Sequence, residues 1–216
     1  MPDAPARPEV TDAVSFQAAS GATDAQMADL ERFRALLAEW NEKLNLVGPS
    51  ALAAFWPRHA WDSAQLLKIE PDARTWADLG AGAGFPGLVL AILLKGKPGA
   101  HVHLVESLGK RCRFLEAVVG TLNLPATVHN ARAESLSLKV DAVTARAVAP
   151  LHKLLGFAEP YLKRGALGVF LKGQDIASEL TEATRYWKFA HDLSPSRSSS
   201  EGRVVRVRKL VRVGKV

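Results

Sequence analysis

The stretch that decides the fold is Thr75–Gly87, TWADLGAGAGFPG, in which four glycines follow a short apolar segment. Apolar residues surround the single acid, Asp78, and the apolar run Leu88–Leu94 begins directly after the last glycine. This order predicts a strand, a glycine-rich turn and a helix. Glycine permits positive φ and close approach of the backbone to a ligand, and the first N–H groups of a helix have no partner inside it. We therefore predict that the turn binds a small molecule at the carboxyl end of the strand.

The spacing of the glycines leaves two ligands open. The residues that match the dinucleotide pattern G-x-G-x-x-G are Gly82, Gly84 and Gly87. Glu106 follows about 20 residues later, as in nicotinamide dinucleotide sites. Asp78 favours another ligand, because a carboxylate repels a pyrophosphate and attracts the cationic groups of S-adenosylmethionine (SAM). Pro86 also lacks an N–H group that a pyrophosphate would use. The stretch thus favours SAM, and a nicotinamide-dependent oxidoreductase remains the alternative.

Composition limits the class of protein. The chain has 216 residues, 48% of them hydrophobic, which is enough for one α/β domain with a helical extension. Its net charge of +6 is compatible with a polyanionic partner. Cys112 is the single cysteine, so we expect no intrachain disulfide and a reducing compartment. The longest apolar run is far shorter than the ~20 residues that span a bilayer, and the first ten residues contain no apolar signal core. We expect a cytoplasmic protein with no membrane segment.

The chain divides into three predicted parts. Residues 1–22 are rich in Pro and Ala without a sustained period, and we expect a flexible tail. Residues 23–72 have apolar positions at helical spacing, beginning with a capping box of Thr23 and Gln26, and predict an N-terminal helical segment. Residues 73–216 form the predicted core.

Within residues 73–216, apolar segments of strand length alternate with helical patterns. The five predicted parallel strands are Thr75–Leu79, His101–Val105, Ala126–His129, Asp141–Ala145 and Ala166–Leu171. The segment around Trp187 and the alternating segment Arg203–Val213 predict a closing antiparallel hairpin, and a serine-rich loop joins them. In Arg203–Val213 we expect the valines to be buried and the arginines to lie on a solvated edge strand. Together these segments predict a mostly parallel seven-stranded sheet with helices on both faces.

The polar residues that matter follow the predicted strands. Asp78 ends the first strand, Glu106 the second, Ala133–Glu134 follow the third, and Arg146 follows the fourth. Because the carboxyl ends of parallel strands meet at one edge of a sheet, we expect these residues to surround one ligand.

Five motifs resemble one bacterial family. They are DLGAGAGFPG from Asp78, VESLGKRCRFL from Val105, NARAESL from Asn130, TARAVAPL from Thr144 and FLKGQ from Phe170. In this order they resemble the glucose-inhibited division protein B family, 16S ribosomal RNA methyltransferases that modify guanine N7. The resemblance covers about Leu30–Leu210. Trp40 stands where the family usually has tyrosine, and Ala145 where serine is common; since neither change removes a charge, we expect activity to be retained.

The resemblance implies a class I SAM-dependent methyltransferase fold and a set of site residues. Transferred residue by residue, its cofactor positions are Gly80, Gly82, Phe85, Ala133, Glu134 and Arg146. Glu106 takes the position that binds the ribose, and Asp78 is the acid near the methionine moiety.

The implied chemistry needs no general base, because guanine N7 carries a lone pair and no proton. Catalysis then depends on alignment, which in favourable systems contributes ~7–11 kcal/mol. We predict Arg146 as the orienting catalytic residue; the alternative is an ion pair with Asp141 or Glu134. His59 and His152 are interpreted as structural or binding residues.

The implied partner is 16S rRNA in the small ribosomal subunit. The predicted RNA-binding residues are Asn45, His59, Lys110, Arg111 and Lys172, and Asp62 is expected to frame the guanine pocket with Asn45 and His59. We expect a monomer without a metal ion. A non-catalytic RNA-binding assembly factor with the same fold is a further alternative.

Overall fold

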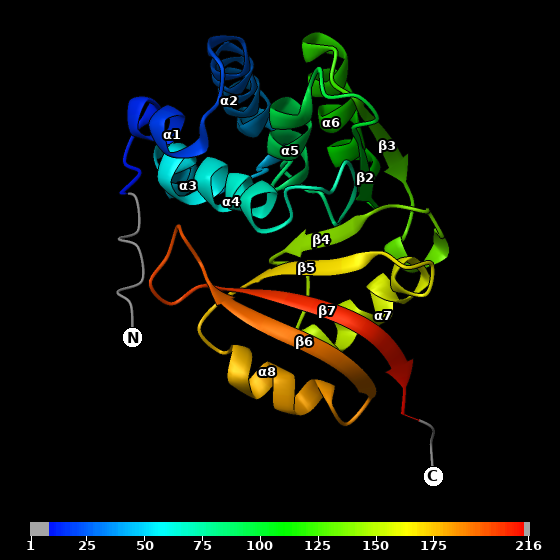
Figure 1. Cartoon of the computed structure of the whole chain (residues 1–216). Coiled ribbons are helices and arrows are strands. Elements are labelled where there is room, and N and C mark those ends of the chain that lie inside the picture. The colour runs from blue at the N-terminus through cyan, green and yellow to red at the C-terminus, as the bar shows by residue number, and fades with distance from the viewer. Residues whose placement is uncertain (1–8, 214–216) are drawn as a thin grey trace.

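The structure is a computed structural model that describes residues 9–213, and Figure 1 shows its arrangement. The N-terminal helices are α1 (Ala13–Ser20), α2 (Asp24–Leu44), α3 (Pro49–Ala53), the π-helix η1 (Phe55–Ala60) and α4 (Trp61–Ile69). The parallel strands are β1 (Thr75–Leu79), β2 (His101–Glu106), β3 (Ala126–Asn130), β4 (Ala142–Arg146) and β5 (Leu167–Lys172). The helices between and after them are α5 (Gly87–Leu94), α6 (Gly109–Leu122), the 3-10 helix η2 (Ala133–Ser135), α7 (Leu151–Leu162) and α8 (Ile176–Ala183). The chain ends in β6 (Trp187–Pro195) and β7 (Arg203–Arg212).

One seven-stranded sheet has the order β3-β2-β1-β4-β5-β7-β6. The strands β1 to β5 pair in parallel, and β7 pairs antiparallel with both β5 and β6. The predicted fold class and the closing hairpin are confirmed, with strand ends shifted by about a residue. Strand order reverses between β1 and β4, which is where open α/β sheets bind ligands.

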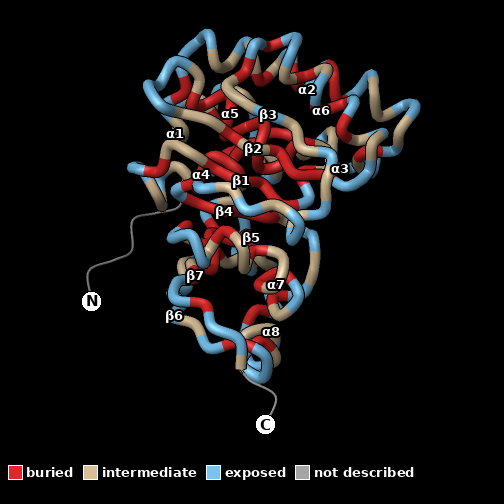
Figure 2. Tube along the Cα trace, turned by 90° about the vertical axis from the view of Figure 1, so that its right-hand side faces the viewer, coloured by how far each residue is buried: buried red, intermediate tan, exposed pale blue. Residues whose placement is uncertain are grey.

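Two hydrophobic clusters cover the two faces of the sheet. The N-terminal helices, α5 and α6 pack on one face with Trp76 and Val102, and α7 and α8 pack on the other with Ala77 and Val105. This alternation of neighbouring strand residues between the two clusters follows from the two-residue period of a strand. In Figure 2 the buried residues are concentrated in β1, β2, β4 and α5, at the centre of the molecule.

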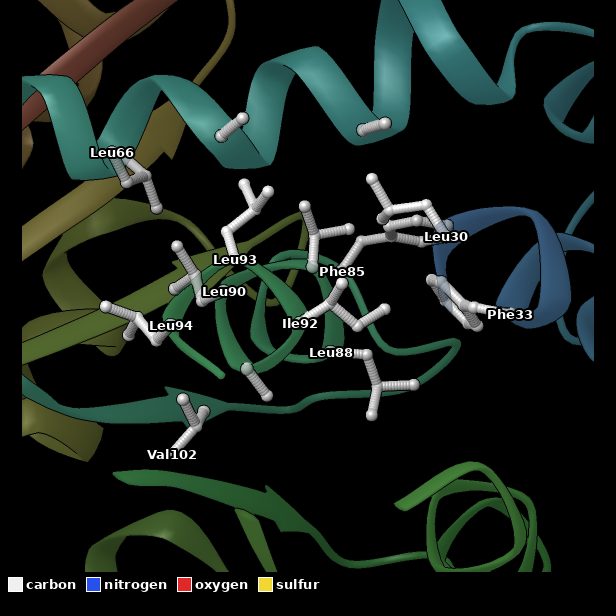
Figure 3. Packing of buried hydrophobic residues seen from close by; sticks show 14 of the residues in the cluster. Leu30, Phe33, Leu66, Phe85, Leu88, Leu90, Ile92, Leu93, Leu94 and Val102 are labelled. Carbon is white, nitrogen blue, oxygen red and sulfur yellow. The ribbon is translucent and has the colours of Figure 1, made fainter. Parts of the chain in front are cut away.

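Helix α5 lies between the sheet and the N-terminal helices. All eight of its residues are buried, so the helix has apolar contacts all round rather than one apolar stripe. In Figure 3 its side chains lie among Leu66 of α4, Leu30 and Phe33 of α2, and Val102 of β2. Residues 23–72 therefore share one core with the sheet, and their separation from residues 73–216 as a distinct domain stays a prediction.

The expectation of a flexible tail over residues 1–22 is wrong where the structure describes it. Helix α1 begins with a capping box in which Asp12 and Ser15 each accept from the other's backbone N–H. Phe16 is fully buried, with ring centroids 5.2 Å from Trp56 and 6.4 Å from Trp61. The capping pair and one aromatic anchor thus order a segment whose composition is typical of loops. Residues 1–8 of the predicted tail lie outside the described residues.

The expected solvated edge at Arg203–Val213 is also wrong, because β6 is the edge strand and β7 lies inside the sheet. Lys209 has φ 55° and the β6–β7 register shifts beside it, which reverses the alternation. Val211 is consequently 58% exposed instead of buried. Arg206 pairs with Glu70 at 3.1 Å and Asp192 at 3.3 Å, so its charge is compensated inside the protein.

Among the described residues, no helix combines the length and apolarity that crossing a membrane requires.

Candidate active site

The glycine-rich turn after β1 is fixed by backbone hydrogen bonds to β2. The N–H groups of Gly80 and Ala81 both donate to the carbonyl of Val105, at 2.8 and 3.0 Å. Gly80 has φ 71°, and a Cβ there would lie 2.8 Å from a methyl group of Val148. Glycine is therefore required at this position both by conformation and by space.

Asp78 lies behind the turn rather than at the cavity wall. Its side chain is fully buried, and its Oδ2 accepts from the N–H of Gly87, the first residue of α5, at 2.8 Å. Its Oδ1 is buried without a hydrogen-bond partner among the described residues. Burial raises the pKa of this carboxyl to about 7, although the Gly87 N–H and Arg146 oppose the rise. Such an orphaned acceptor is the group that an additional cation or N–H donor would satisfy.

Glu106 joins the ends of β1 and β2. Its carboxylate accepts from the N–H of Gly82 at 3.0 Å and from the N–H of Leu108 at 2.8 Å, and Arg111 lies 3.8 Å away. The side chain is 5% exposed. Glu106 thus holds the turn and the start of α6 together, behind the cavity wall.

A cavity of about 700 Å³ opens in front of the turn. Its wall combines the glycine-rich turn, η1 and the start of α4, the ends of β4 and β5, and the β6–β7 loop. Its size is typical of small-molecule sites. The cavity lies at the predicted edge of the sheet, but the N-terminal helices and the closing hairpin supply much of its wall.

Arg146 at the end of β4 lines the cavity. One terminal nitrogen, Nη1, donates to His59 Nδ1 at 2.8 Å and lies 3.7 Å from Asp62 Oδ2, and the guanidinium stacks over Phe85 at 5.1 Å. The next residue, Ala147, has φ 54°, a conformation rare outside glycine and common at functional sites. The predicted alternative partners of Arg146 are wrong: its acidic partner is Asp62.

His59 is held between Arg146 and Phe85. Its ring stacks on Phe85 with centroids 4.8 Å apart, and burial, reinforced by Arg146 and Arg58, lowers its pKa to about 4. The ring is therefore neutral at neutral pH. Because a guanidinium only donates, Nδ1 accepts and the proton lies on Nε2. A neutral ring with a lowered pKa is not suited to act as a base near neutrality, and the role of His59 as a structural or binding residue stays a prediction.

The structure brings together only part of the predicted site. The predicted residues at the cavity wall are Gly80, Gly82, Phe85, Arg146, His59, Asp62, Arg111 and Lys172. Those away from the wall are Asp78, Glu106, Ala133, Glu134, Asn45 and Lys110. Asn45 ends α2 in the left-handed conformation, and the two residues after it reach the wall. The carbonyl of Ala133 accepts from Tyr161 at 3.0 Å, and Glu134 lies 3.8 Å from Arg132.

Lys172 differs from the free RNA-binding cation that the sequence predicts. Its side chain is 10% exposed, and its ammonium group lies 2.6 Å from Glu179 of α8 and 3.0 Å from the carbonyl of Ala149. Since its charge is already paired, the structure favours a role in holding α8 and the segment between β4 and α7 together.

Sequence reasoning missed the contribution of the β6–β7 loop. Ser196 and Ser198 line the cavity, and both hydroxyls approach Asp62. Their signal was weak, because a run of serines is typical of an exposed loop.

Comparison with known proteins identifies the family. The model of the family described as rRNA small subunit methyltransferase G matches residues 26–203. The chain belongs to this family. A member from Caulobacter vibrioides, "Ribosomal RNA small subunit methyltransferase G", is 63% identical over 214 residues, covering 99% of both chains.

Solved structures agree on the fold of this rRNA methyltransferase family member. A SAM-dependent methyltransferase from Aquifex aeolicus aligns with TM-score 0.54 and 18% identity, over 79% of this chain and 97% of its own. Cofactor-bound Rv0187 from MTB aligns with TM-score 0.58 and 15% identity, over 95% and 98% of the two chains. The expected class I SAM-dependent methyltransferase fold is confirmed.

The site residues suit SAM as a ligand. The orphaned Oδ1 of Asp78 is an acceptor with no internal donor among residues 9–213, and the carboxylate of Glu106 lies at the next strand end. Arg146 and Arg111 are balanced by Asp62 and Glu106, at 3.7 and 3.8 Å respectively. Lys172 is likewise paired with Glu179, whereas Arg58 and Arg203 at the wall have no ion pair among the described residues. Family membership decides against the nicotinamide alternative.

Proposed function

We propose that this protein transfers a methyl group from SAM to guanine N7 in the 16S rRNA of the small ribosomal subunit. The observation that carries the proposal is the cavity at the reversal of strand order, with Arg146 fixed at its wall by His59, Phe85 and Asp62. Family membership supplies the reaction class, and the resemblance of the motifs supplies the atom.

Bound SAM supplies an electrophilic methyl group. The residues that would hold it are the glycine-rich turn, Asp78 toward the methionine end and Glu106 toward the ribose; Ala133 and Glu134 follow from the resemblance. The chain's own task is to place the acceptor base. Because N7 needs no deprotonation, the neutral His59 and charged Arg146 act as fixed donors rather than as a base.

Arg146 is suited to orientation because its side chain is held from several sides. A guanidinium has five N–H donors, and the contacts to His59 and Asp62 use Nη1 alone. Within residues 9–213 no hydrogen bond occupies its Nε or Nη2, and these donors remain for an acceptor atom of the base. Its rigid placement lowers the reorganisation that binding requires.

The RNA has to reach this cavity past exposed cations. Lys110 and Arg111 begin α6 beside the turn, and Arg58 of η1 lies at the wall. We propose that these residues contact phosphates, with Asn45 at the end of α2 near the same rim. Lys172 has the least support as an RNA contact, because Glu179 already neutralises it.

The test is methyl transfer from labelled SAM to small subunits from a strain that lacks this protein. We expect labelled N7-methylguanosine in the small-subunit RNA. Tight SAM binding without transfer would instead indicate an assembly factor or another acceptor, and absence of both would overturn the proposal.

A further inference from the structure

The β6–β7 loop is docked on α4 by specific hydrogen bonds. The backbone of Arg197 donates to Gln65 Oε1 at 2.8 Å, and its carbonyl accepts from Trp61 Nε1 at 3.1 Å. Gln65 is fully buried and Ser196 is 2% exposed. Two side chains of α4 thus hold both polar groups of one loop residue, and the loop is fixed to the N-terminal helices although its composition is typical of a mobile segment (Figure 1).

Asp62 connects this docked loop to Arg146. Its Oδ1 accepts from Ser198 Oγ at 2.6 Å and from Gln65 Nε2 at 2.8 Å, while its Oδ2 lies 3.7 Å from Arg146 Nη1. The two oxygens of one carboxylate therefore face different elements. Whatever orients Oδ1 also orients Oδ2, because the carboxylate is planar and rigid.

Ser198 contributes little to docking itself. The backbone contacts of Arg197 to Gln65 and Trp61 hold the loop without the Ser198 hydroxyl. That hydroxyl makes its shortest contact with Asp62 and a second contact, 2.9 Å, with Ser196 Oγ. Its geometry is that of a group that fixes a carboxylate.

We propose that Ser198 and Asp62 are positioning residues that hold the Arg146 guanidinium in place for the acceptor base. The serine-rich loop is thereby part of the acceptor side of the site, reached through a carboxylate of α4. The inference rests on the proposed function for its catalytic consequence, but the placement of Arg146 is measurable without catalysis.

The experiment compares Ser198→Ala, Ser198→Thr and Asp62→Asn with the matched control Ser200→Ala, an exposed serine of the same loop. We expect Ser198→Ala to lower kcat about tenfold, the effect of losing one hydrogen bond to a charged group, with KM for SAM unchanged. Ser198→Thr keeps the hydroxyl and should restore kcat. Asp62→Asn should lower kcat further, because it removes the charge that faces Arg146.

A second readout follows Arg146 itself, by solvent exchange of its side-chain Nε–H in arginine-labelled protein. We expect exchange at least several-fold faster in Ser198→Ala than in the wild type, and unchanged in Ser200→Ala. Equal exchange in all three proteins would overturn the inference, as would an equal loss of kcat in Ser200→Ala. If the wild type transfers no methyl group, the proposed function fails, and the exchange rates still decide the positioning of Arg146.

Discussion

Replacing Asp78 with Asn should stabilise the ligand-free protein at alkaline pH while weakening its binding of SAM. The wild-type carboxylate is fully buried, and Oδ1 has no partner among the described residues. In the Asp78→Asn variant the amide carbonyl still offers an acceptor to the Gly87 N–H, but the side chain does not ionise. The wild type alone therefore carries the cost of a buried charge.

The magnitude follows from the pKa of Asp78, which burial raises from 3.8 to about 7. The folded-state pKa of Asp78 lies above its unfolded-state value. The contribution of this carboxyl group to stability is therefore fully present below about pH 4 and is lost as the pH rises through about 7. From pH 5 to pH 8, at 1.36 kcal/mol per pKa unit, this loss amounts to about 2–3 kcal/mol. The Asp78→Asn variant has no carboxyl group to ionise and does not lose this free energy of unfolding. Its stability relative to the wild type should therefore increase by the same amount between pH 5 and pH 8. For a chain of this length the gain corresponds to roughly 5–10 °C in Tm.

The assay is urea unfolding of ligand-free wild type and Asp78→Asn at both pH values, with SAM affinity measured by calorimetry. The control is Asp72→Asn, at an exposed position shortly before β1. Its free energy of unfolding should differ from that of the wild type by the same amount at pH 5 and at pH 8. Wild-type affinity for SAM should rise with pH as Asp78 ionises, and Asp78→Asn should bind weakly throughout. If the difference in free energy of unfolding between Asp78→Asn and wild type is the same at pH 5 and pH 8, the reasoning about the buried charge is refuted.

Three further predictions follow from single contacts. Lys172→Ala should lower the free energy of unfolding by roughly 1–2 kcal/mol, because it removes the cationic partner of Glu179 and leaves that carboxylate only the N–H of Leu151 among the described residues; an unchanged urea midpoint with weaker RNA binding would restore the RNA role. Gly87→Ala should lower the free energy of unfolding by about 1–3 kcal/mol, because the new Cβ would overlap the Leu104 side chain and lie 2.6 Å from Asp78 Oδ2. The control, Gly120→Ala at an exposed position of α6, should stabilise the protein, and thermal unfolding measures both variants. Lys110→Ala should reduce the salt slope of RNA affinity by about 0.7 and leave SAM affinity unchanged, with Lys188→Ala as the control; equal slopes in the two variants would argue against a phosphate contact.

The parallel sheet is predictable from the sequence because its signals are local. Each strand of β1 to β5 is a short segment with apolar residues that ends at or just before a glycine or a polar residue, and the glycine-rich turn marks where β1 ends. The positions of Asp78, Glu106 and Arg146 follow from strand ends alone, since parallel strands end at one edge. Placing these residues in the fold therefore requires no knowledge of the contacts between them.

The partners of Arg146 could not be predicted from which charged residues lie near it in the sequence. Asp141 is five residues away, but it lies before β4 while Arg146 ends it, which separates them by about 16 Å at 3.3 Å per residue. Asp141 accepts instead from the N–H groups of Arg74 and Thr75, at the opposite end of the sheet. The actual partner, Asp62, comes from α4, and no local pattern fixes how that helix is turned toward the sheet.

The two sides of the cavity are positioned in different ways, which explains why the sequence predicts the residues of one side and not the contacts of the other. The turn after β1 and the acid of β2 are set by the sheet, so local patterns locate them. The other side is built from η1, α4 and the β6–β7 loop. Helix α4 packs against α5, and the loop is hydrogen-bonded to α4. Because α5 is apolar on every side, burying it requires a second layer beyond the sheet, and the N-terminal helices supply that layer. Burial of a single Leu contributes about 1.5–3 kcal/mol. The packing that stabilises α5 involves the helices η1 and α4, and these helices place His59 and Asp62 against Arg146. The acceptor side of the site is thus a consequence of the hydrophobic core, and a change in the α4–α5 contact should alter catalysis without touching a polar residue.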